Sequence, residues 1–163
     1  MNSFIYTASR GYLDHHAIER IVPGNWVDVS YTAFGKKECR YLIPNEFELN
    51  PDVVPLDSHP GAVCMGGYGE AGLAGCEFFF PLRDCPDHKG IYPVFGRVLE
   101  GMDELYRLEK VETVPVTDFP IEGVEVNRPV KPEIIERVEL ELHGEIYPEP
   151  VRVREPELPE CWK

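Results

Sequence analysis

Proline and glycine constrain this sequence more than any other residue types do. Sixteen prolines and fourteen glycines are spread over 163 residues. A proline removes a backbone hydrogen-bond donor and breaks a helix interior, and glycine weakens both helices and strands. Long helices are therefore excluded over most of the chain. Because hydrophobic residues make up 43% and charged residues 28%, the composition favours a globular core, and the length is typical of one domain built from short elements.

Short segments with β-like patterns follow one another along the chain. Apolar and polar residues alternate in 26–31 (WVDVSY), as they do in a half-buried strand. Pro23 and Gly24 predict a turn before it. Several such strands at this spacing favour a barrel or a sandwich. The predicted strands are 18–22, 26–31, 39–43, 61–65, 76–80, 93–99, 111–116 and 134–142, and 117–128 is predicted to be a loop.

Two segments predict helices. In 2–10 the apolar residues recur at helical spacing, and Gly11 follows where a left-handed C-cap belongs. In 102–110 one face is apolar and the other is charged. We expect both helices to cover or flank a β core. The residues expected on the apolar face of the second helix are Met102, Leu105, Tyr106 and Leu108.

Charge and cysteine content exclude some classes of function. The 16 Lys and Arg and the 29 Asp and Glu give a formal net charge of −13, which repels a phosphate backbone, so no nucleic-acid partner is expected. The sequence has no run of 18 apolar residues and no basic-then-apolar start, so we expect no membrane span and a cytoplasmic location. An odd number of cysteines at irregular spacings favours reduced thiols. These are Cys39, Cys64, Cys76, Cys85 and Cys161.

Two motifs are compatible with a cofactor or a metal, and both are better explained without one. Residues 67–72 match GxGxxG, but a pyrophosphate site needs a helix to begin there. The chain continues instead into a predicted strand, so we interpret this motif as a flexible loop. Asp14, His15, His16 and Glu19 are suitable metal ligands, although a polar turn at the surface is the favoured interpretation. No CxxC pair is present, and we expect neither a cofactor nor a metal.

Taken together and in order, several short segments resemble the cyclophilin family of peptidyl-prolyl cis-trans isomerases. The most specific is VFGRVLEGMD at 94–103, which resembles the family's VFGxVxEGMD segment. The resemblance runs collinearly from about Asn2 to Leu142. The other segments are NSF at 2–4, GYLD at 11–14, IERIVPG at 18–24, CEFF at 76–79, RPVKP at 128–132 and IIE at 134–136.

The resemblance implies a mainly β fold, an antiparallel β-barrel capped by helices. We expect residues 1–142 to form this domain and 143–163 to form a proline- and glutamate-rich extension that is extended and largely solvated. Family members carry two strands before the helix with the NF motif, which begins here at Asn2, so the barrel is expected to lack its first two strands. We therefore expect 134–142 to be an open edge. Three explanations are open: the true start lies upstream, a partner or second copy in a homo-oligomer supplies the strands, or the extension folds back; the favoured one is that the extension or a second subunit covers this edge.

The resemblance also implies isomerisation of X-Pro bonds in peptides or unfolded proteins. The barrier to rotation is about 18 to 20 kcal/mol because the peptide bond has partial double-bond character. A catalytic site needs an apolar pocket for the proline ring and a hydrogen-bond donor for the nitrogen that loses its conjugation. Arg20 matches the family's catalytic arginine, and a guanidinium suits this role because it is always charged and presents several donors.

Further residues match positions that bind the peptide in the family. Phe79 and Met65 match apolar contacts with the proline ring, Gly66 and Gly67 match backbone contacts, and Tyr92 matches a His or Tyr. The other predicted substrate-binding residues are Asn25 in place of an aromatic, Asp28 in place of a glutamine, Glu77 before the two phenylalanines, and His88 near the place of a tryptophan.

The departures from the family pattern support a second hypothesis. Asn25 and Asp28 make the predicted pocket more polar, and an ionised Asp28 only accepts hydrogen bonds. They favour a noncatalytic cyclophilin-like module that binds proline-containing peptides or a protein partner. Arg20 and Phe79 favour the enzyme.

Overall fold

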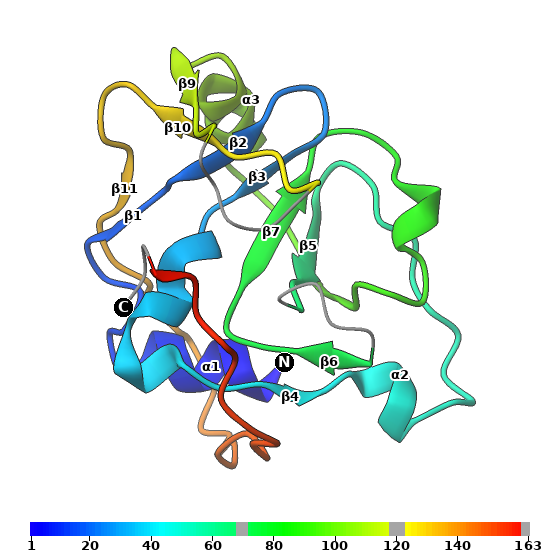
Figure 1. The fold of residues 1–163 in the computed structure, drawn as a ribbon. Coiled ribbons are helices and arrows are strands. Elements are labelled where there is room, and N and C mark those ends of the chain that lie inside the picture. Colours follow the sequence, from blue (N-terminus) through cyan, green and yellow to red (C-terminus); the bar gives the residue numbers. More distant parts are fainter. Residues whose placement is uncertain (68–71, 118–122, 161–163) are drawn as a thin grey trace.

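A five-stranded antiparallel sheet forms the centre of the molecule (Figure 1). The computed structural model describes residues 1–67, 72–117 and 123–160. The strand order is β2-β3-β7-β5-β8. The predicted turn between β2 and β3 is confirmed, since Gly24 has a φ of +73°. The bounds are β2 Arg20–Val22, β3 Trp26–Asp28, β5 Ala62–Met65, β7 Phe78–Pro81 and β8 Val94–Arg97.

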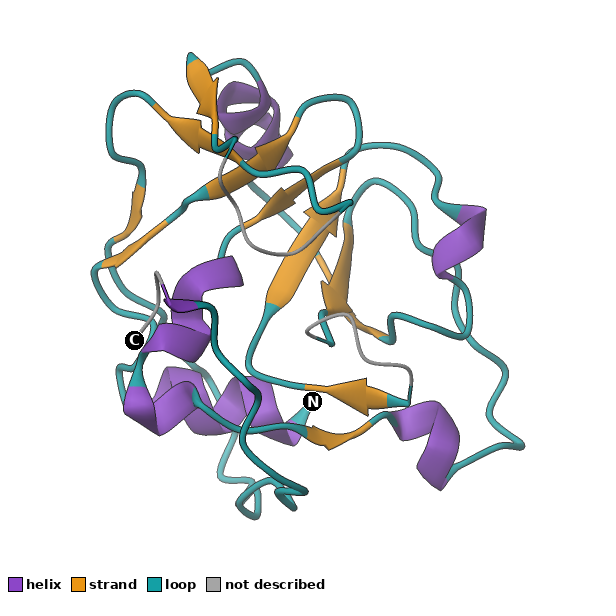
Figure 2. Ribbon diagram, in the orientation of Figure 1, coloured by secondary structure: helices purple, strands orange, loops and turns teal. Residues whose placement is uncertain are grey.

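Three two-stranded antiparallel pairs complete the β structure (Figure 2). Within the described residues these pairs and the central sheet do not join into a closed barrel. The prediction of a mainly β fold with helices is confirmed, whereas the described strands do not show a barrel. The pairs are β1 His16–Ala17 with β11 Ile134–Ile135, β4 Ile43–Pro44 with β6 Leu73–Ala74, and β9 Thr113–Pro115 with β10 Asn127–Pro129.

The hydrophobic core lies on one face of the central sheet. Side chains alternate between the two faces of a strand, and Ile21, Val27 and Phe78 are buried together on the inner face. The helices α1 (Asn2–Ser9) and α3 (Met102–Glu109) contribute to the same cluster. The two remaining short α- and 3₁₀ elements outside this core are α2 (Glu46–Leu49) and η3 (Pro86–His88).

Both predicted helices are confirmed. Gly11 follows α1 with a φ of +68°, the left-handed conformation that glycine adopts most easily. In α3, Leu105 and Leu108 are buried. Tyr106 is 39% exposed, so the prediction that it faces the core was wrong, because it lies roughly 100° around the helix axis from Leu105. No helix among the described residues has the length and apolar character needed to span a bilayer.

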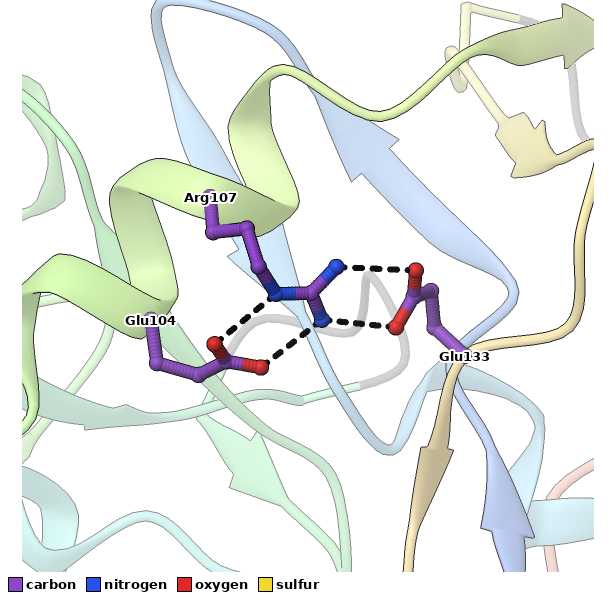
Figure 3. A network of polar contacts seen from close by, with 3 residues as sticks. All are labelled: Glu104, Arg107 and Glu133. Atoms are coloured by element: carbon purple, nitrogen blue, oxygen red, sulfur yellow. Dashed lines mark hydrogen bonds and ion pairs between the residues drawn. The ribbon is translucent and has the colours of Figure 1, made fainter.

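Arg107 ties α3 to the segment that precedes β11 (Figure 3). Its Nε and Nη2 donate to the carboxylate of Glu104 at 2.8 and 2.7 Å, and its Nη1 and Nη2 donate to Glu133 at 3.0 and 2.7 Å. These hydrogen bonds lower the pKa of both carboxyl groups. The main-chain oxygen of Glu133 accepts a hydrogen bond from the Ile18 amide at 2.8 Å. The network therefore links α3 to the chain just before β2.

Two predicted strands are shorter than their sequence patterns indicate, because local hydrogen bonds replace the ladder. β3 ends at Asp28, and the chain turns into the 3₁₀ helix η1 (Tyr31–Gly35). The Ser30 hydroxyl accepts a hydrogen bond from the Phe78 amide at 2.7 Å and thereby takes the place of a backbone partner. In residues 39–43, Cys39 ends the 3₁₀ helix η2 (Lys37–Cys39), Leu42 makes an isolated bridge and only Ile43 lies in a strand.

The predicted long strand 134–142 is also wrong in its extent. Only Ile134 and Ile135 pair with another strand. Beyond them, Val138 donates its amide to the side chain of Asp14 at 3.0 Å, and in the described residues no further strand lies beside 139–142. Val138 and Leu140 nevertheless pack against the core. The alternating pattern therefore predicted which side chains face inward, although the segment has no partner to make a ladder.

The region from 111 to 128 contains more strand than predicted. The predicted strand 111–116 contains β9, but the predicted loop 117–128 ends in β10, whose Asn127 and Arg128 pair with β9. Parts of the two predicted loops lie outside the described residues: 118–122 of the loop 117–128, and 68–71 of the GxGxxG loop.

The candidate metal segment does not gather its side chains. His16 is buried in β1, and burial lowers its pKa to about 4, whereas His15 is exposed. In the described part of the chain no group of three or more His, Cys, Asp or Glu is placed to hold a metal. The described cysteines Cys39, Cys64, Cys76 and Cys85 are buried free thiols, and Cys161 lies outside the described residues.

The C-terminal extension folds back on a part of the domain that the sequence did not indicate. Leu42 and Arg154 form an antiparallel bridge, rather than the expected pairing with 134–142. The Arg152 guanidinium lies 4.6 Å from the Tyr41 ring centroid and donates to the Tyr6 hydroxyl at 2.8 Å. Most of the extension is exposed, but Pro150 and Pro156 are buried against the domain.

We expect deletion of residues 149–163 to lower the melting temperature. The loss includes two backbone hydrogen bonds at Leu42, at about 1 kcal/mol each, and the arginine–tyrosine contacts. About 2 kcal/mol corresponds to a fall of roughly 4 to 8 °C for a chain of this size. Differential scanning calorimetry measures the melting temperature. The control is Ile146→Ser, because this side chain is 93% exposed. An unchanged melting temperature of the truncated protein would contradict the anchoring role.

Candidate active site

Antiparallel pairing places Arg20, Asp28, Phe79 and Cys64 in one row across four strands. Arg20 pairs with Asp28, Asp28 with Phe79, and Phe79 with Cys64. Directly paired residues point to the same face of a sheet. These side chains therefore lie on the outer face, opposite the hydrophobic core. Two segments that are far apart in the sequence, ERIVPG and CEFF, meet in this row.

A cavity of about 80 Å³ lies on this outer face. The Phe79 ring packs edge to face against His88 and Tyr92, each with its centroid 5.5 Å away. The volume is far below the ~300 Å³ at the lower end of small-molecule pockets, so the cavity suits one small ring rather than a whole ligand. Its lining consists of Arg20, Trp26, Glu77, Phe79, His88 and Tyr92.

Arg20 is held on several sides at the rim of the cavity. Its Nε donates to the main-chain oxygen of Glu125 at 2.8 Å, and its Nη1 donates to Asp28 Oδ2 at 3.0 Å. The guanidinium carbon lies 4.7 Å from the Tyr31 ring centroid and 5.6 Å from that of Trp26. Its Nη2 has no partner among the described residues, so this nitrogen remains available as a donor to a ligand.

Asp28 lies behind Arg20 and does not line the cavity. Its side chain is 1% exposed, against 13% for Arg20. Burial raises the pKa of this carboxyl, and hydrogen bonds with Glu77 and Arg20 act against that shift. Oδ1 is buried and has no conventional hydrogen-bond donor among the described residues. The aspartate therefore contacts Arg20 rather than the cavity.

Gly66 and Gly67 lie where no larger residue fits without a shift of its neighbours. A Cβ atom on Gly66 would lie 2.4 Å from Glu77 Cδ, and one on Gly67 would lie 2.5 Å from the Leu73 carbonyl oxygen. The Gly66 amide donates to the Glu77 carbonyl oxygen at 2.8 Å, and the Gly66 oxygen accepts from Gly75. The backbone groups of Gly66 are thus already used inside the protein, and what this glycine supplies is the space into which Glu77 packs.

His88 and Tyr92 keep their neutral forms at neutral pH. Burial, with a smaller effect from Arg83, lowers the pKa of His88. Burial, with a smaller effect from Glu77, raises the pKa of Tyr92. Ser58 Oγ lies 3.4 Å from His88 Nδ1 and orients that ring. The aromatic side of the cavity is therefore uncharged, and the Tyr92 phenol retains its proton.

Like Asp28, Gly66 and Gly67, the predicted site residues Met65 and Asn25 do not line the cavity. Met65 pairs with Phe78 on the inner face of the sheet, because it is one position removed from Cys64. Asn25 lies in the turn between β2 and β3, where its Oδ1 accepts a hydrogen bond from Arg83 Nε at 2.7 Å.

Trp26 is the site residue that sequence reasoning missed. Its ring lies 5.5 Å from His88 and 6.3 Å from Phe79 between centroids, so it supplies the aromatic wall that Asn25 does not. The sequence contained a signal for Trp26: residues 26 and 28 are two apart in a predicted strand, so their side chains share a face. The aromatic ring has moved by one position relative to the family pattern.

Comparisons with known proteins agree on one family. A sequence profile described as "Cyclophilin type peptidyl-prolyl cis-trans isomerase/CLD" matches residues 1–148. A peptidyl-prolyl cis-trans isomerase of Arabidopsis thaliana is 34% identical over 131 residues, which cover 77% of this chain and 76% of that protein. Peptidyl-prolyl cis-trans isomerase-like 1 of Gibberella zeae is 31% identical over 138 residues, with 85% and 82% covered.

Other similar proteins are longer, or are known by their structures. The human peptidylprolyl isomerase domain and WD repeat-containing protein 1 is 27% identical over 77% of this chain, and the match spans only 19% of that protein. A cyclophilin-type isomerase of Cryptosporidium parvum has a similar fold, with a TM-score of 0.61, 20% identity and 83% and 79% of the two chains covered. That protein was also crystallised in the presence of the dipeptide Ala-Pro, and this second structure gives a TM-score of 0.56 at 21% identity, with 78% and 79% covered.

We expect Gly66→Ala to destabilise the protein and to displace Glu77 from the cavity. The added carbon meets a buried side chain at 2.4 Å, and overpacking of this kind costs about 1 to 3 kcal/mol. Urea unfolding measures the loss. Gly96→Ala is the matched control in β8, because its Cβ would meet Val63 at an ordinary 3.6 Å. Equal stability of the two variants would show that Glu77 can move aside freely.

Proposed function

Because the chain belongs to the cyclophilin-type peptidyl-prolyl cis-trans isomerase family, we propose that its outer-face cavity binds the ring of a substrate proline and that Arg20 catalyses rotation about the preceding bond. The observation that carries this proposal is the position of a guanidinium beside a small cavity walled by aromatic rings. The substrates are X-Pro segments of peptides or unfolded proteins.

Isomerisation of an X-Pro bond requires a pocket for the proline ring and a hydrogen-bond donor. Rotation is slow because the peptide bond loses conjugation at the twisted geometry, with a barrier of about 18 to 20 kcal/mol. At that geometry the proline nitrogen regains a lone pair that accepts a hydrogen bond. A donor that meets this nitrogen only in the twisted state lowers the barrier without tightening the ground state. Arg20 Nη2 is the donor that fits, since Nε and Nη1 are already engaged.

The ring is held by the rest of the lining. Phe79, Trp26 and His88 offer apolar faces and edges to the proline methylenes, and all three rings lie within 6.3 Å of one another. The Tyr92 hydroxyl is a donor for a peptide carbonyl. With the proline ring held in the cavity, rotation about the preceding peptide bond moves only the residue on the other side of that bond.

A second candidate function rests on the contacts of Arg20. Asp28 and the Glu125 carbonyl accept hydrogen bonds from two of its nitrogens. A guanidinium engaged in this way is compatible with a module that binds proline-containing segments without catalysing their isomerisation. The two functions use the same cavity, and they differ only in whether exchange between cis and trans is accelerated.

We also infer that the described strands are part of an antiparallel barrel whose open positions are filled by self-association. In the part of the chain that the structure describes, β8 has a partner strand on one side only, and a groove of about 560 Å³ runs beside it. Phe80, Phe95 and Val98 stay partly exposed next to the core. An unpaired edge and a partly covered apolar face are both suited to pairing with a strand from a second copy.

We expect wild-type protein to accelerate cis–trans exchange of an Ala-Pro peptide and Arg20→Ala to lose most of this. A hydrogen bond from a charged donor contributes about 1.5 to 3 kcal/mol, so kcat/KM should fall roughly 10- to 100-fold. NMR exchange spectroscopy measures the rate. Arg128→Ala is the control, because that arginine lies on β10, does not line the cavity and forms an ion pair with Glu19 at 3.8 Å.

The same experiment separates the two candidate functions. Equal rates for wild type and Arg20→Ala would remove Arg20 from catalysis. Peptide resonances that broaden on binding, with exchange no faster than in free peptide, would favour the binding module.

Self-association should increase with salt. The formal net charge of −13 repels a second copy, and the Debye length falls from about 10 Å at 0.1 M salt to about 3 Å at 1 M. We expect sedimentation velocity to show a dimer fraction that rises with protein concentration and with sodium chloride. A monomer under all of these conditions would contradict completion of the barrel by a second copy.

A further inference from the structure

Ser58 joins three parts of the chain beside the cavity. It is 3% exposed and lies in the loop that leads into β5. Its carbonyl oxygen accepts a hydrogen bond from the Cys85 amide at 2.8 Å. Its Oγ lies 3.4 Å from Cys64 Sγ in β5 and 3.4 Å from His88 Nδ1 in η3. Because His88 lines the cavity, one buried serine links the cavity wall to the central sheet.

The direction of these hydrogen bonds decides which nitrogen of His88 carries the proton. Burial raises the pKa of Cys64 to about 11, so the thiol keeps its proton at neutral pH. If the thiol donates to Ser58 Oγ, the serine hydroxyl donates in turn to His88 Nδ1. In the reverse direction the hydroxyl would donate to sulfur, which is the poorer acceptor, and the thiol would have no acceptor among the described residues. The first direction satisfies both donors, and Nδ1 is then an acceptor.

A neutral imidazole whose Nδ1 accepts a hydrogen bond carries its proton on Nε2. Burial lowers the pKa of His88, so the ring is neutral at neutral pH. Within the described residues Nε2 makes no hydrogen bond, and it is not one of the buried polar atoms that lack a partner there. This nitrogen is therefore accessible, and its ring forms part of the cavity wall. A ligand in the cavity can meet a neutral N–H donor here.

We propose that Ser58 is a positioning residue that fixes His88 with its proton on Nε2, and that His88 donates a hydrogen bond from this nitrogen to a carbonyl oxygen of the bound peptide. The inference rests on the proposed binding of a proline ring in the cavity. Edge-to-face contacts with Phe79 and Tyr92, at 5.5 and 4.8 Å between ring centroids, hold the plane of the imidazole. A neutral donor needs no counter-charge, and every X-Pro segment supplies a main-chain carbonyl beside its proline.

The first test reads the position of the proton and does not depend on catalysis. In protein labelled with ¹⁵N at the histidines, long-range ¹H–¹⁵N spectra distinguish a protonated ring nitrogen from a bare one. At neutral pH we expect His88 to be protonated on Nε2, and we expect its Nδ1 resonance to shift in Ser58→Ala, because that nitrogen loses its donor. A wild-type His88 protonated on Nδ1 would overturn the proposal. An Nδ1 resonance that does not move in Ser58→Ala would do the same.

The second test measures the dissociation constant of an Ala-Pro peptide by NMR titration. His88→Phe keeps an aromatic wall and removes the donor. Ser58→Ala removes the hydroxyl and keeps the backbone hydrogen bond with Cys85. We expect each variant to raise the dissociation constant about threefold to tenfold, while kcat for exchange changes by less than about twofold, as for a contact made equally in the ground and transition states. The double variant should bind no more weakly than His88→Phe, because Ser58 acts through that ring.

Lys89→Gln is the matched control for these variants. Lys89 follows His88 in the chain and forms an ion pair with Asp57, the residue before Ser58, at 2.7 Å. Both side chains of this pair are exposed, at 46% and 75%, so its loss should leave the affinity for the peptide unchanged.

The binding data can contradict the proposal at two points. Wild-type affinity in His88→Phe would overturn the role of this ring as a donor. Losses that add together in the double variant would show that Ser58 does not act through His88. A wild-type protein that binds no Ala-Pro peptide would overturn the donor role together with the proposed function, and the ¹⁵N spectra would still decide whether Ser58 fixes the ring.

Discussion

The ion pair between Arg20 and Asp28 spans two neighbouring strands, and the rest of the candidate site is arranged around it. Both side chains are largely withdrawn from water, with 13% and 1% exposure, and a buried pair is stable only when its geometry is good and its remaining hydrogen bonds are satisfied. The β2–β3 register provides that geometry, and the β3–β7 register continues the same row to Phe79. A slip of one residue would turn every member of this row to the opposite face.

The sheet separates two kinds of chemistry. On its inner face, apolar side chains from the strands, α1 and α3 make the core. On its outer face, a charged cluster adjoins a ring of aromatic side chains at a cavity of about 80 Å³. Polar groups of the site are therefore kept out of the core, and α3 stabilises the hairpin that carries Arg20, since Glu109 accepts a hydrogen bond from the Gly24 amide at 2.9 Å.

Sequence patterns predicted the elements better than their extents. The helices at 2–10 and 102–110 have caps and periodicity within their own residues, and both are present. The strand pattern of 134–142 was correct for side-chain direction, since Val138 and Leu140 face the core, but a ladder needs a neighbouring strand that local sequence does not specify. The position of the C-terminal extension depended on Tyr6 and Tyr41, which are over a hundred residues away from Arg152.

The sequence by itself determined the family, the short-element β architecture, and the choice of Arg20 and Phe79 as candidate site residues, because these follow from local motifs in a fixed order. Only the tertiary structure decided the surroundings of Arg20. It placed Asp28 behind the guanidinium, brought Glu77 into contact with that carboxyl, substituted Trp26 for the aromatic expected at Asn25, and turned Met65 inward. The physical reason is that strand register fixes which face each side chain occupies, and register is set by pairing between segments up to some fifty residues apart, which no local pattern encodes.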